Sequence, residues 1–186
     1  MHIRNTLPDV ITFAGNGEPT LHPAFAEIID DTIKLRNRLA PQARIAVLSN
    51  ATMLHKKKVF DALLKVEENI QKLDSAFEET IKIMDCPRGS FILSRVVDQL
   101  KKFNGQLIIQ TMFLKGEFNG QQFDNTTTEE ISAWLALLKT INPSQVMIYT
   151  IARDTPLDTL KKIPESELNR IALLVKKEGF DVQVSA

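Results

Sequence analysis

The chain has 186 residues, of which 44% are apolar and 25% are charged, as in ordinary soluble globular proteins. Lysine plus arginine and aspartate plus glutamate number 23 each, so the net charge of zero favours neither nucleic acid nor membrane as a partner. A single cysteine, Cys86, excludes an internal disulfide and suits a reducing cytoplasm. No apolar run has the length of a membrane span, and the N-terminus lacks a signal-peptide core.

Strand-like and helix-like segments alternate along the chain. Short apolar runs predict strands at residues 11–14, 45–48, 69–74, 107–114, 146–151 and 180–184. Helical spacing predicts helices at residues 25–39, 55–66, 91–103, 131–141 and 166–177. The unit repeats about five times at roughly 30 residues, which favours a parallel sheet with helices outside, as a barrel or an open doubly wound sheet. We therefore expect one α/β domain over residues 1–186.

The segments between these elements carry end signals. His22 and Pro23 are expected to open the first helix, in which apolar residues have roughly helical spacing: Phe25, Ile28, Ile29, Ile33 and Leu35. Ser75 with Glu78 has capping-box spacing, so a short helix is expected to start there, and Thr126 with Glu129, or Thr127 with Glu130, supplies another capping box. The glycine-, asparagine- and glutamine-containing residues 116–124 are predicted as a loop, and residues 153–164 as a loop or short helical turn.

A glycine-rich turn follows the first predicted strand. Gly15, Asn16 and Gly17 accept positive φ, and Pro19 stiffens the backbone directly after Glu18. A carboxylate is therefore held at the carboxyl end of a strand, where α/β proteins bind ligands. The alternative is a well-formed strand-to-helix turn with an exposed glutamate.

Polar residues also follow the other predicted strands. They are Ser49 and Asn50; Lys72, Asp74 and Ser75; Gln110 and Thr111; and Tyr149, Thr150 and Arg153. Because parallel strands point the same way, these groups are expected to converge on one face and to suit a polar small molecule. The alternative for each residue alone is that strand ends meet loops, and loops are polar.

The hydrogen-bonding capacity of these side chains suggests a role for each. An ionised Glu18 can accept hydrogen bonds from an ammonium group. Asp74 or Ser75 can bond ribose hydroxyls, and Asn50 and Gln110 can orient a carboxylate or an adenine edge. The three histidines are scattered, and Cys86 has no partner near it in the sequence, so neither a metal site nor a thiol nucleophile is favoured.

The stretch Thr12-Phe-Ala-Gly-Asn-Gly-Glu-Pro-Thr-Leu-His-Pro23 resembles the second-strand motif of radical S-adenosylmethionine (radical SAM) enzymes. The form is closest to the branch related to the wyosine-forming tRNA enzyme. Leu48-Ser49-Asn50 resembles the third-strand end of that branch, and Lys72-Leu73-Asp74-Ser75 resembles its fourth-strand segment. The resemblance implies a partial (β/α)₆ barrel in which the first strand and its loop are missing, so that this chain is the C-terminal part of the core, starting near strand two.

The same resemblance implies a binding site for S-adenosylmethionine (SAM). Its residues would be Gly15, Asn16, Gly17, Glu18, Pro19, Asn50, Asp74, Ser75, Gln110 and Thr150. Members of this family also bind a [4Fe–4S] cluster through three cysteines, a set that the single Cys86 cannot supply. The intact enzyme would cleave SAM reductively to a 5′-deoxyadenosyl radical and act on a modified nucleoside or a peptide, whereas this chain alone is expected to be inactive.

Two other functions compete with this interpretation. The chain could be a cluster-free α/β domain that binds a nucleotide-like metabolite or a partner protein. It could also carry aldolase-like chemistry through Lys72 as a Schiff-base lysine, because burial can activate a lysine. The missing neighbour that the radical SAM resemblance implies leaves the first strand of this chain with an open edge, which predicts a homodimer or aggregation.

Overall fold

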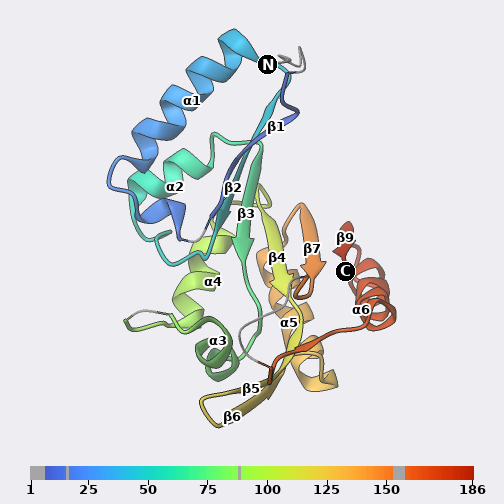
Figure 1. Ribbon diagram of the computed structural model, residues 1–186. Coiled ribbons are helices and arrows are strands. Elements are labelled where there is room, and N and C mark those ends of the chain that lie inside the picture. Colours follow the sequence, from blue (N-terminus) through green and yellow to red (C-terminus); the bar gives the residue numbers. More distant parts are fainter. Residues whose placement is uncertain (1–6, 16, 88, 153–157) are drawn as a thin grey trace. The chain divides into compact units, whose positions relative to one another are not determined.

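The computed structural model shows a mostly parallel α/β fold (Figure 1). It describes residues 7–15, 17–87, 89–152 and 158–186. The chain falls into two compact units, Met1–Ile70 and Gln71–Ala186, which are taken in turn. The single domain expected from the sequence stays a prediction. In the described part of the chain, no helix is both long and apolar enough to cross a membrane.

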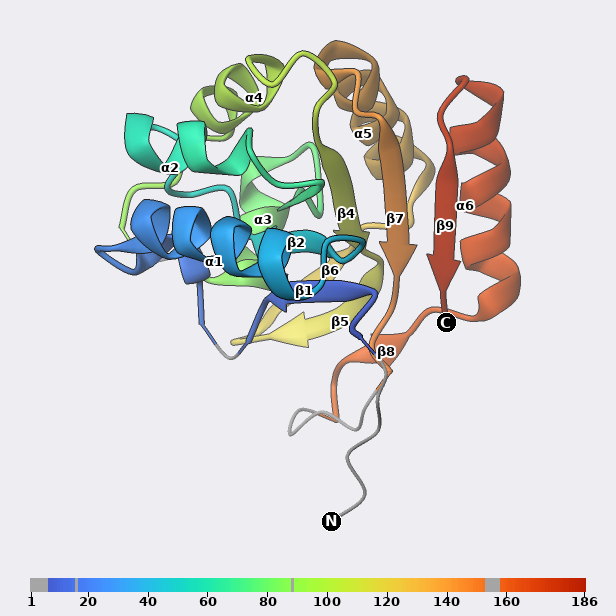
Figure 2. The same cartoon turned by 90° about the horizontal axis from the view of Figure 1, so that it is seen from above.

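The first unit is built from two parallel strands and two helices. Its elements are β1 Val10–Phe13, the 3₁₀ helix η1 Pro19–Leu21, α1 Phe25–Leu39, β2 Arg44–Ser49, α2 Lys57–Leu63 and the start of β3 Glu68–Lys72. The β1–β2 register runs from Val10 opposite Arg44 to Phe13 opposite Val47. The helices α1 and α2 lie side by side, as Figure 2 shows.

The core of the first unit lies between α1 and β2. Phe25 and Ile29 of α1 are buried, as are Ile45 and Val47 of β2. No residue of β1 is buried, although the strand is apolar. Strands of parallel sheets are normally covered on both faces, so β1 is unusually open for its composition.

Glu67 holds the beginning of β2 in place. Its Oε2 accepts a hydrogen bond of 2.9 Å from the Ile45 amide, and its Oε1 lies 2.9 Å from Nη1 of Arg36. The same Arg36 nitrogen donates to the Ala43 carbonyl at 2.6 Å. Partial burial opposes the charge of Glu67, but the Ile45 amide and Arg36 lower its pKa overall.

The second unit carries the remaining elements. They are α3 Glu78–Asp85, α4 Leu93–Lys101, β4 Ile108–Met112, β5 Leu114–Phe118, β6 Gln121–Asp124, α5 Thr128–Ile141, β7 Gln145–Tyr149, β8 Lys161–Lys162, α6 Glu165–Lys177 and β9 Val182–Ser185. Strands β4, β7 and β9 are parallel neighbours, with Ile109 opposite Val146 and Val146 opposite Val182. Helix α6 lies along β9 (Figure 2).

Trp134 is the largest fully buried side chain of this unit. Its ring meets Phe113 edge to face, with centroids 5.3 Å apart and planes at 86°. This is a favoured geometry for an aromatic pair. Phe113 joins β4 to β5, and its amide donates to the Tyr149 carbonyl at 2.7 Å. The pair therefore anchors the carboxyl ends of β4 and β7 on helix α5.

The loop expected at residues 116–124 is wrong, because this segment forms the β5–β6 hairpin. Asn119 and Gly120 both have positive φ, 49° and 77°, as a type I′ turn requires. Phe118 pairs with Gln121 directly across the turn. An Asn-Gly pair is the strongest short-range sequence signal for a β-hairpin. The hairpin forms here although the polar residues around the pair favoured a loop.

Two expectations about helix starts are also wrong. Helix α1 begins at Phe25 rather than at His22 or Pro23, because the 3₁₀ helix η1, started by Pro19, occupies the preceding turn. Ser75 and Glu78 form no capping box, since the residue that caps α3 makes no side-chain hydrogen bond, but the short helix expected to start there is present as α3. Strand β8 lies within residues 153–164, which were expected to be a loop or short helical turn, and residues 153–157 of that range lie outside the described residues. The other predicted helices and strands begin and end within a few residues of their predicted positions.

Two further findings concern side chains. Of the apolar residues with helical spacing in α1, Ile28 and Leu35 are 36% and 51% exposed. The capping role of Thr127 is confirmed, since its hydroxyl oxygen accepts from the Glu130 amide at 3.3 Å. The Glu130 carboxylate, however, does not return to the cap, because it bonds Ser75 and Thr80.

Candidate functional site

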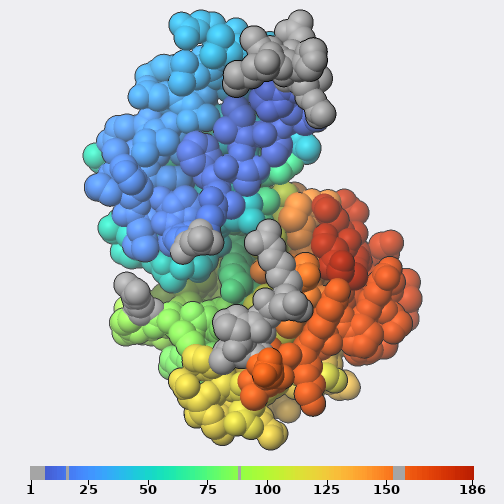
Figure 3. Space-filling view, in the orientation of Figure 1, coloured from blue at the N-terminus to red at the C-terminus, as the bar shows by residue number. Residues whose placement is uncertain are grey.

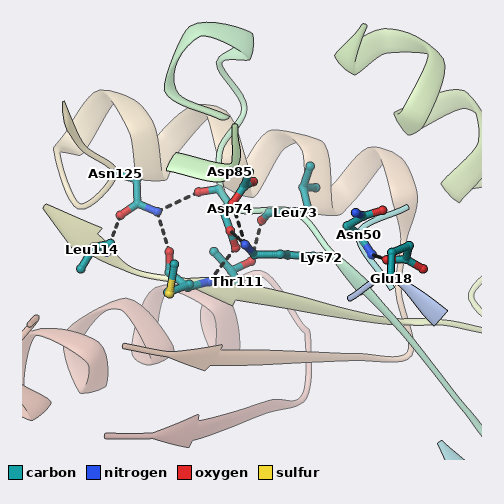
Figure 4. Close-up of polar contacts among 10 residues, drawn as sticks. Glu18, Asn50, Lys72, Leu73, Asp74, Asp85, Thr111, Leu114 and Asn125 are labelled. Atoms are coloured by element: carbon teal, nitrogen blue, oxygen red, sulfur yellow. Dashed lines mark hydrogen bonds and ion pairs between the residues drawn. The ribbon is translucent and has the colours of Figure 1, made fainter. Parts of the chain in front are cut away.

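In the first unit, the Glu18 carboxylate joins the turn after β1 to the end of β2. Oε1 accepts hydrogen bonds from the Thr20 amide, at 3.0 Å, and from the Thr20 hydroxyl. Glu18 thereby caps the N-terminus of η1. Oε2 accepts from the Asn50 amide at 2.6 Å (Figure 4). A carboxylate offers about four acceptor directions, and these bonds use three of them. Glu18 is partly exposed and keeps capacity for one further donor.

The turn after β2 is held by its own side chains. Oδ1 of Asn50 accepts from the amide and hydroxyl of Thr52, at 3.1 and 2.6 Å, and Oγ of Ser49 accepts from the Ala51 amide at 3.1 Å. Ala51 is buried with φ of 63°, a costly conformation for a residue with a Cβ. Such a conformation persists only where the surrounding structure holds it. The hydrogen-bonded turn at Ala51 therefore keeps Asn50 beside Glu18.

The glycines before Glu18 leave open space. Gly15 does not have the positive φ that its turn suggested. Among the described residues, and apart from each glycine's chain neighbours, no atom lies within 4 Å of a Cβ built on Gly15 or Gly17, so this backbone is accessible to a ligand. Asn16 lies outside the described residues. Pro19 is the first residue of η1.

In the second unit, a buried ion cluster lies after β3. Nζ of Lys72 lies 2.8 Å from Oδ2 of Asp74 and 2.6 Å from Oδ1 of Asp85. The side chain of Asp74 is fully buried, and its Oδ1 accepts from the Met112 amide at 2.8 Å (Figure 4). Asp74 therefore braces the end of β4 against the end of β3.

The electrostatics of this cluster follow from burial. Burial, with a smaller contribution from Asp85, raises the pKa of Asp74 to about 7, although Lys72 opposes the shift. Burial alone would lower the pKa of Lys72, but the two aspartates raise it above its ordinary value. Burial also raises the pKa of Tyr149, and the charge of Asp74 adds to this effect. Lys72 is thus a firmly protonated cation.

Asn125 completes the cluster, and the sequence pattern did not indicate it. Its Nδ2 donates to the carbonyls of Asp74 and Met112, each at 2.8 Å, and its Oδ1 accepts from the Leu114 amide at 2.8 Å. One buried amide side chain therefore satisfies three backbone groups from three separate segments (Figure 4). Only the capacity of asparagine to donate and accept together could have suggested this role.

The other predicted residues of this unit are partly committed within the chain. The Ser75 hydroxyl donates to Oε2 of buried Glu130 at 2.6 Å. The Thr150 hydroxyl accepts from the Ile163 amide at 3.0 Å. Gln110 contributes its carbonyl to the Leu73 amide, while its side chain is half-buried. Among these three, Gln110 is the residue whose side chain makes no hydrogen bond to other described residues and so is available to a ligand.

The described residues do not fit a [4Fe–4S] cluster. Such clusters need several thiolates, and Cys86 is the only cysteine of the sequence. It is exposed. Within residues 7–15, 17–87, 89–152 and 158–186, no group of three histidine, cysteine or acidic side chains is placed to hold a metal ion.

Comparisons with known sequences find several similar proteins. No protein-family profile matches the chain. It is 31% identical over 153 residues to a UPF0026 protein of Synechocystis, covering 80% of this chain and 52% of that protein. It is 26% identical over 172 residues to the GTPase Obg of Brachyspira hyodysenteriae, covering 24% of it, and 28% identical over 180 residues to a UPF0026 protein of Helicobacter pylori, covering 54% of it. The chain spans about half the length of these UPF0026 relatives.

Comparisons with solved structures give a consistent fold. A domain of pyruvate-formate lyase-activating enzyme from Bacteroides vulgatus matches 95% of this chain and 98% of its own, with a TM-score of 0.64 and 16% identity. SuiB of Streptococcus suis bound to SAM matches with a TM-score of 0.68 and 15% sequence identity, and the match covers 95% of this chain and 39% of SuiB. A radical SAM methyltransferase from Sphaerobacter thermophilus matches with a TM-score of 0.68 and 13% sequence identity, and the match covers 95% of this chain and 50% of the methyltransferase. The chain therefore has the fold found in radical SAM enzymes.

Asp74 should make the stability of the protein depend on pH. Its pKa is raised from 3.8 to about 7, so the folded state binds this proton more tightly than the unfolded state. The free energy of unfolding should then fall as pH rises through this range. Lys72 stays protonated throughout this pH range, so it adds nothing to the pH dependence of the free energy of unfolding there. In Asp74→Asn, the free energy of unfolding measured by urea titration should depend less on pH between these values than it does in wild type.

The matched control is Asp98→Asn, which changes an exposed aspartate of α4. It should retain the wild-type slope. Equal slopes for wild type and Asp74→Asn would contradict the buried, proton-binding role of Asp74.

Proposed function

We propose that this chain binds SAM as the C-terminal part of a radical SAM core. The observation that carries the proposal is the anchored Glu18 carboxylate, fixed by Thr20 and by the Asn50 amide at the ends of two parallel strands. A rigid carboxylate with one free acceptor direction is suited to an α-ammonium group. The likeness in fold to radical SAM enzymes supports the choice of SAM among ligands with such a group.

In this proposal, Glu18 accepts from the ammonium of SAM, and the Asn50 side chain orients its carboxylate. The backbone at Gly15 and Gly17 lets the ligand approach closely, since no atom of the described residues other than the chain neighbours fills the space beside them. Gln110 belongs to the second unit, and its contact with the ribose or adenine stays a prediction from the resemblance. Asp74, Ser75 and Thr150 would act by holding strand ends of that unit, because their oxygens already bond this chain's own groups.

The activity of the whole protein is a further step of the proposal. The chain covers about half of its UPF0026 relatives, and its residues do not supply the three thiolates of a [4Fe–4S] cluster. We propose that an intact protein with such a cluster cleaves SAM reductively to a 5′-deoxyadenosyl radical, and that this chain alone is inactive. The substrate would be a modified nucleoside or a peptide; SuiB has been solved with its precursor peptide SuiA. We also propose a cytoplasmic location, which the single exposed cysteine supports.

Two alternative functions can be distinguished from this proposal. A cluster-free domain that binds another nucleotide-like metabolite remains the second candidate, and a measurement of SAM binding distinguishes it from the radical SAM proposal. Aldolase-like chemistry through Lys72 is disfavoured, because a Schiff-base lysine needs a lowered pKa. Asp74 and Asp85 instead raise the pKa of Lys72.

Glu18→Gln should weaken SAM binding by about tenfold, the order expected when one charge-assisted hydrogen bond becomes neutral. The variant keeps an acceptor oxygen for Thr20. Isothermal titration calorimetry of the full chain measures the dissociation constant. 5′-Methylthioadenosine, which lacks the amino acid, should bind both proteins equally. Equal SAM affinity in wild type and variant, or no SAM binding by wild type, would remove the proposal.

Gly17→Ala tests the open backbone independently of charge. A Cβ at this position meets no atom of the chain within 4 Å, so thermal stability should change little. SAM affinity should fall several-fold, because the added methyl group enters the space assigned to the ligand. Unchanged SAM affinity at unchanged stability would show that the ligand does not approach this backbone.

The open strand β1 supports the predicted homodimer. In the described residues β1 pairs with β2 alone, and Val10, Ile11 and Phe13 are only half-buried. Size-exclusion chromatography with light scattering should show a dimer at high concentration, and Ile11→Lys should shift it to monomer. Leu173→Lys, at an exposed leucine of α6, is the control and should stay dimeric. A wild-type monomer at every concentration would exclude this dimer.

A further inference from the structure

The small sheet formed by β8, β5 and β6 has one polar face. The strands are antiparallel, with Lys115 directly opposite Asp124 on one side and Lys161 on the other, and Glu117 opposite Gln122. Residues directly opposite in an antiparallel pair project from the same face of the sheet. These five side chains therefore share one face, which the sequence analysis missed because it treated this region as a loop.

This polar face is hollowed into a cavity of about 640 Å³. Its lining is Lys115, Gly116, Glu117, Gln122, Phe123, Asp124, Thr159 and Lys161. Such a volume is within the range of small-molecule sites. On the surface, residues of the β5–β6 hairpin, yellow in Figure 3, adjoin the orange residues around β8.

The wall of the cavity is held by close backbone packing. A Cβ on Gly116 would collide with the Thr159 carbonyl oxygen, and the φ of Gly116 is 155°. Only glycine permits this approach. The Thr159 hydroxyl also donates to the Glu117 carbonyl at 2.6 Å. The cavity is therefore a formed feature of the chain rather than a gap between loose segments.

The lining of the cavity carries two lysines, Lys115 and Lys161, and two carboxylates, Glu117 and Asp124, so its formal charges sum to zero. Lys115 and Lys161 are cross-strand neighbours, and like charges directly opposite destabilise a sheet. In the described part of the chain, no ion pair joins either ammonium group to a carboxylate. Oδ1 of Asp124 already accepts from the amide and hydroxyl of Thr126. An anion between the two lysines would relieve their repulsion.

A more distant carboxylate does not take that place. Glu167 of α6 senses the charge of Lys115, but its main partner is Arg170, with Nη2 2.7 Å from its Oε1. The Arg170 guanidinium is the main cause of the lowered pKa of Glu167, and Lys115 is a minor one. Glu167 is thus mainly paired with Arg170 rather than with Lys115.

We propose that this cavity binds a sugar phosphate, with the phosphoryl group between Nζ of Lys115 and Nζ of Lys161. Lysine ammonium groups are strong donors to phosphoryl oxygens. Glu117, Gln122 and Asp124 supply acceptors on the same face for the sugar hydroxyls. A bare anion would leave these acceptors unused and face two carboxylates, whereas a phosphorylated polyol satisfies both halves of the cavity.

The test is calorimetric titration of the full chain with ribose 5-phosphate, ribose, adenosine 5′-monophosphate and a short single-stranded RNA. Ribose 5-phosphate should bind, and ribose should bind at least tenfold more weakly. Lys115→Ala and Lys161→Ala should each weaken ribose 5-phosphate binding by about tenfold. RNA that binds no more tightly than adenosine 5′-monophosphate would support a site for a free sugar phosphate. RNA that binds clearly more tightly would overturn the proposal in favour of a nucleic-acid backbone.

Lys162→Ala is the matched control. Lys162 adjoins Lys161 in β8 but pairs with Leu114, so its side chain belongs to the other face. It should bind ribose 5-phosphate like wild type. Equal losses in Lys161→Ala and Lys162→Ala would reduce the effect to general charge and overturn the proposal, as would absence of binding by wild type. The cavity and Glu18 involve separate residues, so SAM binding can fail while this proposal stands, and the reverse.

Discussion

The structure depends on satisfying backbone amides and carbonyls where buried strands begin and end. An unpaired buried polar group costs more than an ordinary hydrogen bond gains, so each such position needs a partner. In the second unit, Asn125 and Asp74 supply these partners for the end of β4 and the segments beside it. In the first unit, Glu67 does so for the start of β2, and Glu18 for the turn that follows it.

This constraint changes the meaning of polar residues at strand ends. Asp74, Ser75 and Thr150 are polar because the chain itself must be hydrogen-bonded there, whatever ligand it binds. The alternative that strand ends are simply polar thus accounts for part of the pattern. Glu18 differs because it remains partly exposed, keeps an acceptor direction and lies beside backbone that no side chain covers. A side chain that is exposed and has an unused hydrogen-bond acceptor can contact a ligand, whereas a polar side chain whose hydrogen bonds are all made within the chain stabilises the fold.

Most helices and strands could be predicted from the sequence because their signals are local. The spacing of Phe25 and Ile29 and the apolar run of β2 are properties of neighbouring residues. The β5–β6 hairpin was also within reach, since Asn119-Gly120 signals its turn, but the polar composition around it suggested a loop. The roles of Asn125 and Glu130 could not be predicted, because their partners lie many residues away. The residues of the candidate site could be selected from the sequence, but their free or committed state could not.

The charged clusters of the second unit illustrate the same distinction. Lys72 lies between two aspartates, so its charge is used within the chain and stabilises the fold. Lys115 and Lys161 are placed opposite each other, and in the described residues neither ammonium group is held in an ion pair, although Glu117 and Asp124 share their face. The proposed phosphoryl group would lie between these two lysines and would interact with both charges. A lysine that is not held in an ion pair is therefore a better candidate for an external ligand than Lys72 is.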